Sequence, residues 1–235
     1  MENGQLDNRT ALEHRIRKCE RCEAYKDEQL DNRTALEPGG AELHVEILAI
    51  TPDAERVIEQ AGRTCYLSFD RIGDQSERSF IQRLIKMGHE SPLEHAYATF
   101  RLRNCSRAMT HQLVRHRLMA VSQQSQRYVD EKGFQYVVPE SIPAEFIQEY
   151  HQDMMYMEQL YRKWRDRGLK KEDARFVLPN ACTSEIVVSA NFREWRHIFT
   201  LRLSPKAQWE IRKACVMILD ILRRHAPNCF EDMHP

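Results

Sequence analysis

From residue 43 onward, apolar positions recur either at every second residue or at helical spacing, and these periods predict strands and helices respectively. Residues 43–50 and 96–103 alternate and predict strands, as does the β-branched run 186–191. Thr51 and Pro52 predict a helix start, because Thr is a good N-cap and Pro suits the first helical position. The other predicted helices span 76–88, 106–117, 143–167, 171–178, 191–202 and 205–225.

The predicted helix 106–117 differs from the others because it presents a concentration of polar side chains near its C-terminal end. Ser106 is a suitable N-cap for it. Side chains three and four positions apart share one helix face, so we expect a broad polar face and an opposite core side. The polar face holds His111, Gln112, Arg115 and His116, and the core side holds Leu113, Val114 and Leu118.

A polar run follows this helix, in a pattern that suits a phosphate and a heterocycle. Arg115-His116-Arg117 is followed by seven residues, then Ser125, and then Arg127. Arg binds phosphate through a bidentate fork, and Ser in a tight turn can complete such a site. The glutamines of the run carry both a donor and an acceptor, so they can recognise an amide-like ring edge. The pattern predicts a nucleotide site; the alternative is a solvated basic helix followed by a polar loop.

The segment 89–95, His-Glu-Ser-Pro-Leu-Glu-His, raises the possibility of a metal site, because it holds two His and two Glu in seven residues. Its spacing is not the i, i+4 His pair of a zinc protease helix, and Pro92 interrupts it. Cys19-x-x-Cys22 is the one close cysteine pair, and it has neither a second Cys pair nor a His pair nearby. We therefore expect no metal.

Residues 1–40 contain an internal duplication. Gln-Leu-Asp-Asn-Arg-Thr-Ala-Leu-Glu occurs at 5–13 and again, identically, at 29–37. Two copies are too few for a solenoid, and the segment is charged and poor in large apolar residues. We expect residues 1–40 to be a mobile extension and 41–235 to form the folded domain, with a tandem partner-binding motif as the alternative reading of the repeat.

Composition narrows the class of protein. The chain has 235 residues and a formal net charge of zero, whereas proteins dedicated to duplex nucleic acid are usually basic. It has no apolar run long enough to cross a membrane, and its start lacks the basic and apolar regions of a secretory signal. Its seven cysteines are scattered rather than paired in a disulfide framework. We expect a cytoplasmic protein.

Arg115-His116-Arg117, seven residues and Ser125 reproduce without a gap the signature of the flavin-dependent thymidylate synthases. The chain is similar to this family over about residues 43–230, in five separate patches that follow the family's order. Besides the signature, the patches are 88–95, Ala174-Arg175 with Leu178-Pro179, 191–202 with its Asn, Arg, His and final Leu-Arg, and Ala207-Gln208-Trp209-Glu210-Ile211.

The resemblance implies an enzyme that methylates dUMP to dTMP, and so a role in dTMP biosynthesis. Members of the family take the carbon from methylenetetrahydrofolate and the reducing hydride from NADPH by way of FAD. The resemblance also implies an α+β fold, with a central sheet flanked by helices, and a homotetramer whose active sites are shared between subunits. The Met- and Tyr-rich face of helix 143–167 suits such packing, although a core role is the default.

The resemblance implies roles for individual residues. Arg202 would lie beside the uracil ring as the catalytic residue. The residues expected to bind FAD are His89, Ser91, Glu94, Arg115, His116, Arg117, Gln123, Asn191, Arg193 and His197. The residues expected to bind dUMP are Gln112, Arg115, Gln123, Gln124, Ser125, Gln126, Arg127, Arg175 and Arg202.

Two points remain open at the level of the sequence. Many members of the family carry an acidic residue where this chain has Gln123, so a carboxylate contact would become an amide contact. Residues 106–128 also resemble a helix–turn with a basic recognition helix. The alternative function is therefore a nucleic-acid-binding regulator that uses the helix 106–117, although the zero net charge argues against it.

Overall fold

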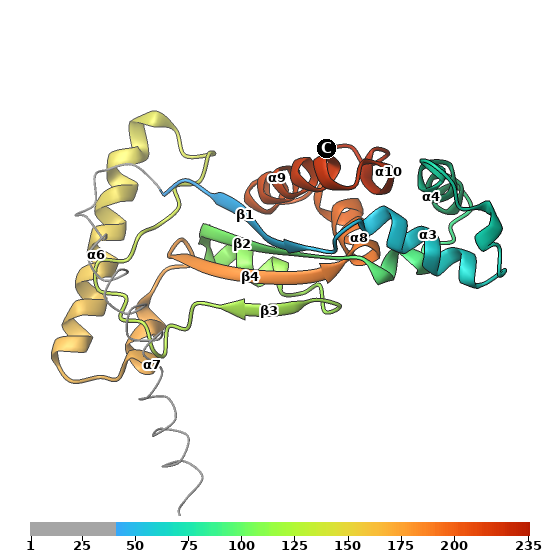
Figure 1. The fold of residues 1–235 in the computed structure, drawn as a ribbon. Helices are drawn as coiled ribbons and strands as arrows, with labels where there is room; N and C mark the ends of the chain where they lie inside the picture. The colour runs from blue at the N-terminus through green and yellow to red at the C-terminus, as the bar shows by residue number, and fades with distance from the viewer. Residues whose placement is uncertain (1–40) are drawn as a thin grey trace, which may run out of the picture. The chain divides into compact units, whose positions relative to one another are not determined.

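A computed structural model describes residues 41–235 of the chain. Within these residues, the central feature is a four-stranded antiparallel sheet with the strand order β1-β2-β4-β3 (Figure 1). The strands are β1 (His44–Ile50), β2 (Tyr97–Ser106), β3 (Ala120–Gln123) and β4 (Thr183–Asn191). The predicted α+β class is confirmed, and β1, β2 and β4 overlap the three ranges predicted as strands.

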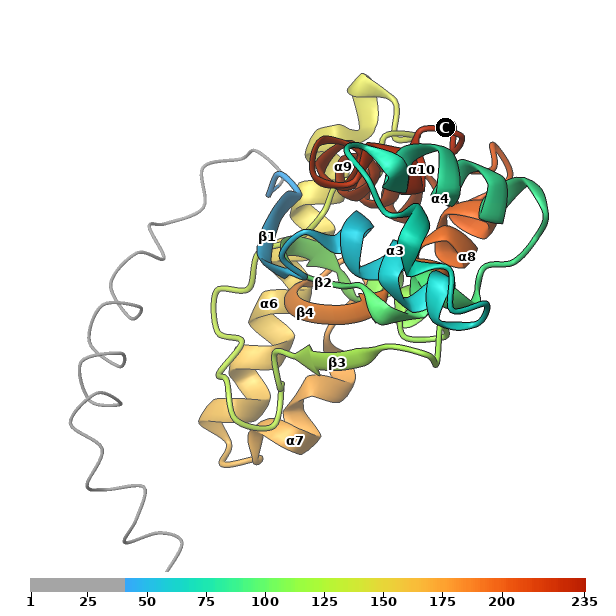
Figure 2. The ribbon, with the colours of Figure 1, turned by 45° about the vertical axis from the view of Figure 1, so that its right-hand side comes forward.

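The helices occupy three positions around this sheet (Figures 1 and 2). On one side lie α8 (Phe192–Arg202), α9 (Trp209–His225) and α10 (Pro227–Phe230). Beyond the end of β1 lie α3 (Ala54–Thr64) and α4 (Ser76–Lys86), and at the opposite end lie α6 (Ile147–Asp166) and α7 (Lys171–Ala174). The short α5 (Arg107–Leu113) continues directly from β2.

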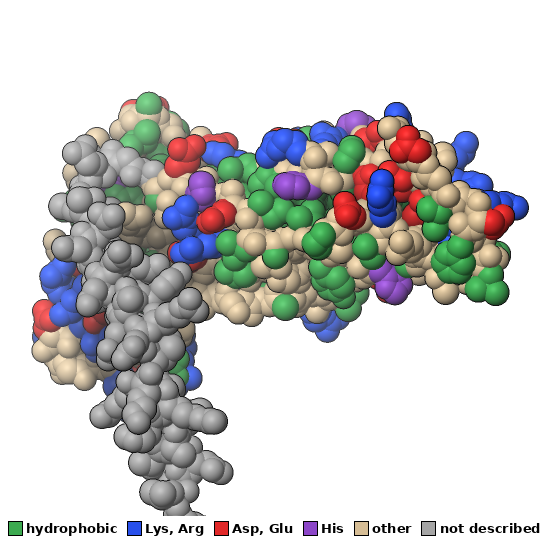
Figure 3. Space-filling model, in the orientation of Figure 1, with side chains coloured by type: hydrophobic (Ala, Val, Ile, Leu, Met, Phe, Trp, Pro, Cys, Tyr) green, Lys and Arg blue, Asp and Glu red, His purple; other side chains and the backbone are tan. Residues whose placement is uncertain are grey.

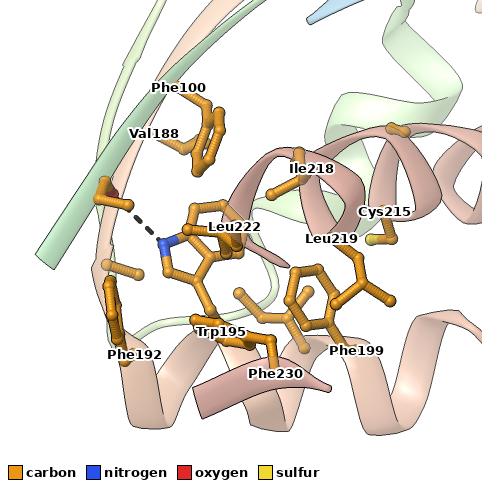
Figure 4. Close-up of a cluster of buried hydrophobic side chains, with 14 of the residues drawn as sticks. Phe100, Val188, Phe192, Trp195, Phe199, Cys215, Ile218, Leu219, Leu222 and Phe230 are labelled. Carbon is orange, nitrogen blue, oxygen red and sulfur yellow. Dashed lines mark hydrogen bonds between the residues drawn. The ribbon is translucent and has the colours of Figure 1, made fainter. Parts of the chain in front are cut away.

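The core forms between the sheet and the helices α8, α9 and α10. Every second residue of β2 and β4 faces it, including the fully buried Phe100 and Val188, which are neighbours across the two strands. Trp195 of α8 packs edge-on against Phe100 and donates its indole N–H to the carbonyl of Ala98 at 3.2 Å (Figure 4). This packing anchors α8 on the sheet, and α8 carries several of the predicted site residues.

The start of α3 was predicted wrongly. Thr51 does not cap the helix, because its N–H donates to the carbonyl of Tyr97 and its hydroxyl accepts the N–H of the same residue, each at 2.9 Å. Thr51 therefore prolongs the pairing of β1 with β2. The helix begins at Ala54, and Asp53 is its N-cap in the left-handed region, with φ 47°.

The helix 106–117 is shorter than predicted. The Ser106 cap is confirmed, since its hydroxyl accepts the N–H of Met109, but α5 ends at Leu113. Arg115 and His116 therefore lie in a turn and not on a helical face. Of the three residues assigned to the core side, Leu113 is buried, whereas Val114 and Leu118 are 37% and 77% exposed and were assigned wrongly.

Among the described strands and α-helices, β3 and α10 were not predicted. Residues 144–146 and 175–177 adopt 3₁₀ turns beside α6 and α7, which otherwise lie within the predicted ranges. The predicted extension 1–40, its repeat and Cys19-x-x-Cys22 lie outside the described residues, so these predictions stay open.

Candidate active site

Arg202, the last residue of α8, lies against the turn that follows α5. Its Nε donates to Nε2 of His116 at 2.9 Å, and its Nη2 donates to the carbonyl of Gln112 at 3.3 Å. Within residues 41–235 its Nη1 makes no hydrogen bond. The guanidinium is thus fixed along one edge, while the remaining nitrogen is left for a ligand.

His116 is suited to hold Arg202 because it is neutral. It is 6% exposed, and its ring lies 6.2 Å from that of His197, measured between centroids. Burial, followed by electrostatic interactions with Arg202 and His197, lowers the pKa of His116 from 6.5 to about 4. At neutral pH, Nε2 therefore carries a lone pair that accepts from Arg202, and the ring proton is on Nδ1.

The direction of the segment 89–95 is set by the C-terminal end of α4. Gly88 adopts φ 70°, and the N–H groups of Gly88 and His89 donate to the carbonyls of Ile85 and Leu84, which is the helix-ending arrangement that favours glycine. The chain then forms a 3₁₀ turn over Ser91–His95. His89, just before the turn, and Ser91, its first residue, are both exposed and so available to a ligand.

The start of α8 lies next to this segment. Asn191 is the N-cap, and its side-chain oxygen accepts the N–H of Glu194 at 2.8 Å. One residue into the helix, Arg193 donates to the carboxylate of Glu94, and both side chains are about half exposed. Three predicted flavin contacts, Glu94, Asn191 and Arg193, are thereby brought together.

A second cluster of predicted residues lies at the end of the sheet beside α7. Arg127 donates through Nε to the carboxylate of Glu172 at 3.0 Å, and Arg175 donates to the backbone carbonyl of Glu172 at 3.1 Å. The hydroxyl of Ser125 accepts the N–H of Arg127 at 3.3 Å. Lys171 adds a further cation, bonded to the carbonyl of Tyr128. The predicted phosphate residues Ser125, Arg127 and Arg175 therefore share one location.

The three glutamines of the polar run are engaged inside the fold. The amide of Gln123 donates to the hydroxyls of Thr110 and Ser184, at 3.0 and 3.1 Å. Gln124 donates to the buried carboxylate of Glu131, and Gln126 is itself buried. These contacts orient β3 and the following loop, so any contact of these side chains with a ligand stays a prediction.

Not all predicted residues meet within one chain. Arg115 and Arg117 are exposed, and neither side chain has a hydrogen-bond or ion-pair partner in the described part of the chain. No such contact within residues 41–235 joins the cluster around Arg202 to the cluster around Arg127 either. Figures 1 and 2 place α7 at the far end of the sheet from α3 and α4.

Several supporting residues could not be found by reasoning from the sequence. Glu172, which organises the second cluster, lies in a run of charges that gives no signal of its own. Arg196, one residue before His197, is buried beside Asp232 and likewise carried no motif that singled it out. Their partners are separated from them by tens of residues, and only the fold brings them together.

The side chains present fit an anionic ligand that also has a polar ring. Unpaired guanidiniums and hydroxyls suit phosphate groups, and a fixed Arg edge with a neutral His suits a ring carbonyl. Within residues 41–235 no three His, Cys, Asp or Glu side chains are placed to hold a metal ion. On the face shown in Figure 3 the charged side chains of both signs are mixed, in contrast to the basic surface that duplex binding needs.

Fold and site together define a class, an α+β protein whose clustered cationic side chains fit an anionic ligand. A family model described as thymidylate synthase complementing protein matches residues 46–228. A flavin-dependent thymidylate synthase of Geobacter sulfurreducens is 41% identical over 203 residues, which cover 82% of this chain and 88% of the relative. A flavin-dependent thymidylate synthase of Pyrococcus abyssi is 44% identical over 164 residues, which cover 67% of this chain and 67% of the relative. One of Clostridium tetani is 35% identical over 218 residues, which cover 82% of this chain and 87% of the relative.

The chain therefore belongs to the flavin-dependent thymidylate synthase family, and the resemblance seen in its motifs is confirmed. The alternative of a nucleic-acid regulator loses its basis, because the helix proposed for groove recognition ends at Leu113. None of the described helices combines the length and the apolar character needed to cross a bilayer.

Proposed function

We propose that this chain is an enzyme that methylates dUMP at C5 to give dTMP, with methylenetetrahydrofolate as carbon donor, NADPH as reductant and FAD as cofactor. Family membership supports this activity. The observation that carries it is the edge-on fixation of Arg202 by His116 and the Gln112 carbonyl, which leaves one guanidinium nitrogen for a pyrimidine.

In the proposed reaction, Arg202 is the catalytic residue. Negative charge that develops on the pyrimidine carbonyl and ring nitrogen is stabilised by a fixed cation, and C5 becomes nucleophilic as a result. Such electrostatic stabilisation is strongest when the donor is positioned before the reaction and needs no reorganisation. His116 provides that positioning, since a neutral imidazole accepts from Arg202 whereas an imidazolium would repel it.

The phosphate of dUMP would bind at the second cluster. Arg127 is paired with Glu172 on the exposed surface, and such pairs contribute little to stability, so a phosphate can displace the carboxylate. Arg175 lies three residues after Glu172 in the sequence and donates to its carbonyl. Ser125 supplies a hydroxyl in a tight turn beside Arg127. The side chains of Ser125, Arg127 and Arg175 would then donate hydrogen bonds to the phosphate from two segments of the chain.

Arg115, Arg117 and the residues around 89–95 and 191–197 are the side chains that would hold FAD. The exposed guanidiniums suit its diphosphate, and the amides and hydroxyls suit the polar edge of its ring system. When bound, this cofactor supplies hydride transfer. A cysteine nucleophile is disfavoured, because burial raises the pKa of the Cys105 and Cys215 thiols to about 12.

We further propose that the active site is composite and that the enzyme is a homotetramer. The separation of the Arg202 and Arg127 clusters within one chain supports this, because a nucleotide bound at Arg202 of one chain would receive its phosphate contacts from another. A cytoplasmic location fits the five described cysteines, all free thiols and four of them buried.

A direct test combines spectroscopy with turnover. The purified protein is expected to show flavin absorption, or to acquire it with added FAD, and to form dTMP from dUMP only when methylenetetrahydrofolate and NADPH are both present. Omission of dUMP gives the background NADPH oxidation. A protein that binds FAD but never forms dTMP from the complete mixture contradicts the proposed function.

A further inference from the structure

Arg196 of α8 is a buried cation, paired with half-exposed carboxylates, that the proposed function does not use. Its side chain is 8% exposed, and its two terminal nitrogens donate to both carboxylate oxygens of Asp232, at 2.6 and 2.7 Å. One of these nitrogens also donates to the carbonyl of Cys229 at 2.7 Å. A bidentate pair of this kind fixes the plane of the guanidinium as well as its position.

The remaining nitrogen of Arg196 points to the segment 89–95. Its Nε lies 3.5 Å from the carboxylate of Glu90, close enough for an ion pair but with no hydrogen bond. In the described part of the chain it is the buried side-chain nitrogen or oxygen for which no hydrogen-bond partner is found. Glu90 lies between His89 and Ser91, two residues expected to contact the flavin.

The C-terminal segment, residues 226–235, is hydrogen-bonded to the neighbouring helices as well. Asn228 donates from both its backbone and its amide to Glu55 of α3, at 2.7 and 2.6 Å. Gln82 of α4 donates to Glu231. The C-terminal segment therefore joins α3, α4 and α8, and the segment 89–95 follows directly after α4.

We propose that Asp232 and Arg196 are positioning residues, and that through Glu90 they fix the segment 89–91 against α8 and thereby set the affinity for the flavin. This inference rests on the proposed function only for the identity of the ligand. The link itself, from Asp232 through Arg196 to Glu90, is a property of the protein without ligand. Arg193 and His197 flank Arg196 on the same helix, so the link controls the distance between the two groups of expected flavin contacts.

The loss of Asp232 has a defined physical consequence. A buried guanidinium without its bidentate partner is unfavourable, so Arg196 is expected to rotate toward solvent or toward Glu90. Either movement changes the position of Glu90, and with it that of His89 and Ser91. The effect is therefore expected at residues 89–91, which lie 141 to 143 positions before Asp232 in the sequence, and not just at the C-terminus.

The test uses the full chain with Asp232→Ala and, as matched control, Asp220→Ala, which removes an exposed carboxylate of α9 whose nearest cation is 3.9 Å away. Amide hydrogen exchange without flavin is measured first, followed by FAD affinity by fluorescence quenching. For Asp232→Ala we expect faster exchange over 89–95 and an FAD dissociation constant about tenfold higher, or about 1.4 kcal/mol. Asp232→Glu, which keeps a carboxylate, is expected to recover part of the affinity, and Asp220→Ala to behave like wild type.

The outcomes separate this inference from the proposed function. Faster exchange over 89–95 in a protein that binds no FAD supports the link and contradicts the flavin site. Exchange that changes only within 226–235, with unchanged FAD affinity, overturns the inference. If Asp232→Ala does not fold, Asp232→Asn and Glu90→Gln alter the same link with smaller changes in shape, and unchanged exchange and affinity in both overturn it equally.

Discussion

The contact between Arg202 and His116 makes the function of one side chain depend on the protonation state of another. Arg202 can be held only by an acceptor, and His116 accepts through Nε2 because its environment keeps it neutral. His116, which lies between two arginines of the signature, would thus position a third arginine, Arg202, located 86 residues further along the chain.

The first prediction tests whether His116 is needed as a hydrogen-bond acceptor for Arg202 or as an imidazole ring. His116→Gln keeps an acceptor of similar reach, whereas His116→Leu removes it. We expect His116→Leu to lower kcat/KM for dUMP by about 100-fold, the effect of displacing a positioned group by about 1 Å, and His116→Gln to retain most of the activity. Steady-state kinetics of both variants measure this. Equal losses in the two variants would show that the imidazole ring itself, and not its acceptor, is required.

The second prediction concerns the dependence of stability on pH. The pKa of His116 is lowered in the folded state, so the unfolded chain binds the proton more readily between pH 6.5 and about pH 4. Stability is therefore complete above pH 6.5 and falls through this window, by at most about 3 kcal/mol for a shift of this size. Urea unfolding at several pH values measures it, and His116→Gln should remove this part of the slope.

The same experiment contains an internal control. Hydrogen bonding to Arg196 lowers the pKa of Asp232, so its contribution is present above its ordinary value of 3.8 and is lost only at more acidic pH. A loss of stability in His116→Gln that still lies between pH 6.5 and 4 would point to a different group.

The third prediction concerns Ser125. Its hydroxyl accepts from the backbone of Arg127, and within residues 41–235 no basic side chain is hydrogen-bonded to it that would make it a nucleophile. Ser125→Ala is expected to raise KM for dUMP about tenfold, in line with the loss of one hydrogen bond to a charged group, and to leave measurable turnover. Complete loss of methylation with normal dUMP affinity would contradict the assignment to phosphate binding.

At the scale of elements, α8 combines two roles at its first turn. Asn191 caps the helix through its side-chain oxygen, and we propose that it also contacts the flavin. The fourth prediction separates the capping role of Asn191 from its role in flavin binding. Asn191→Ala should lower the free energy of unfolding by about 1 kcal/mol and weaken FAD binding, whereas Asn191→Ser, which still caps, should weaken FAD binding alone. Thermal unfolding and FAD titration of the two variants decide between the roles.

The elements that could be predicted from the sequence are those in which a regular pattern of apolar residues persists over most of the element. Residues 143–167 contain a clear apolar stripe, and α6 with its preceding 3₁₀ turn fills that range. Arg115-His116-Arg117 had helical spacing as well, but it carries no apolar residue to bury and the helix ends before it. The edge strand β3 was missed because its residues are mostly exposed, and pairing with β4 makes it a strand.

The site was predictable to the extent that motifs carried it. The clusters around Arg202 and around Arg127 each contain residues named from the sequence, and the partners that organise them do not belong to any motif. Thr51 shows the same limit on a smaller scale. Its sequence suits an N-cap, yet the sheet offers it two hydrogen bonds to Tyr97, and a local preference of about 1 kcal/mol does not outweigh them.

At the scale of the whole molecule, the separation of the two clusters leads to the fifth prediction. If the ring of dUMP binds at Arg202 of one chain and its phosphate at Arg127 of another, then Arg202→Ala and Arg127→Ala each damage a different half of every site. Subunits of the two variants, mixed and reassembled, should form some sites in which both halves are wild type. Random assembly gives about a quarter of the sites in this state for an equimolar mixture.

The measurement is dTMP formation by the reassembled mixture, compared with each variant alone and with wild type treated in the same way. Sedimentation of the unmixed proteins establishes whether they are tetramers. Recovery near the expected fraction requires that each site draws Arg202 and Arg127 from different chains, because a site built within one chain would carry one of the two substitutions in every subunit. A mixture no more active than its components would place both arginines of a site in the same chain. The loop 124–135 would then have to rearrange and bring Arg127 closer to Arg202, so that one nucleotide could contact both.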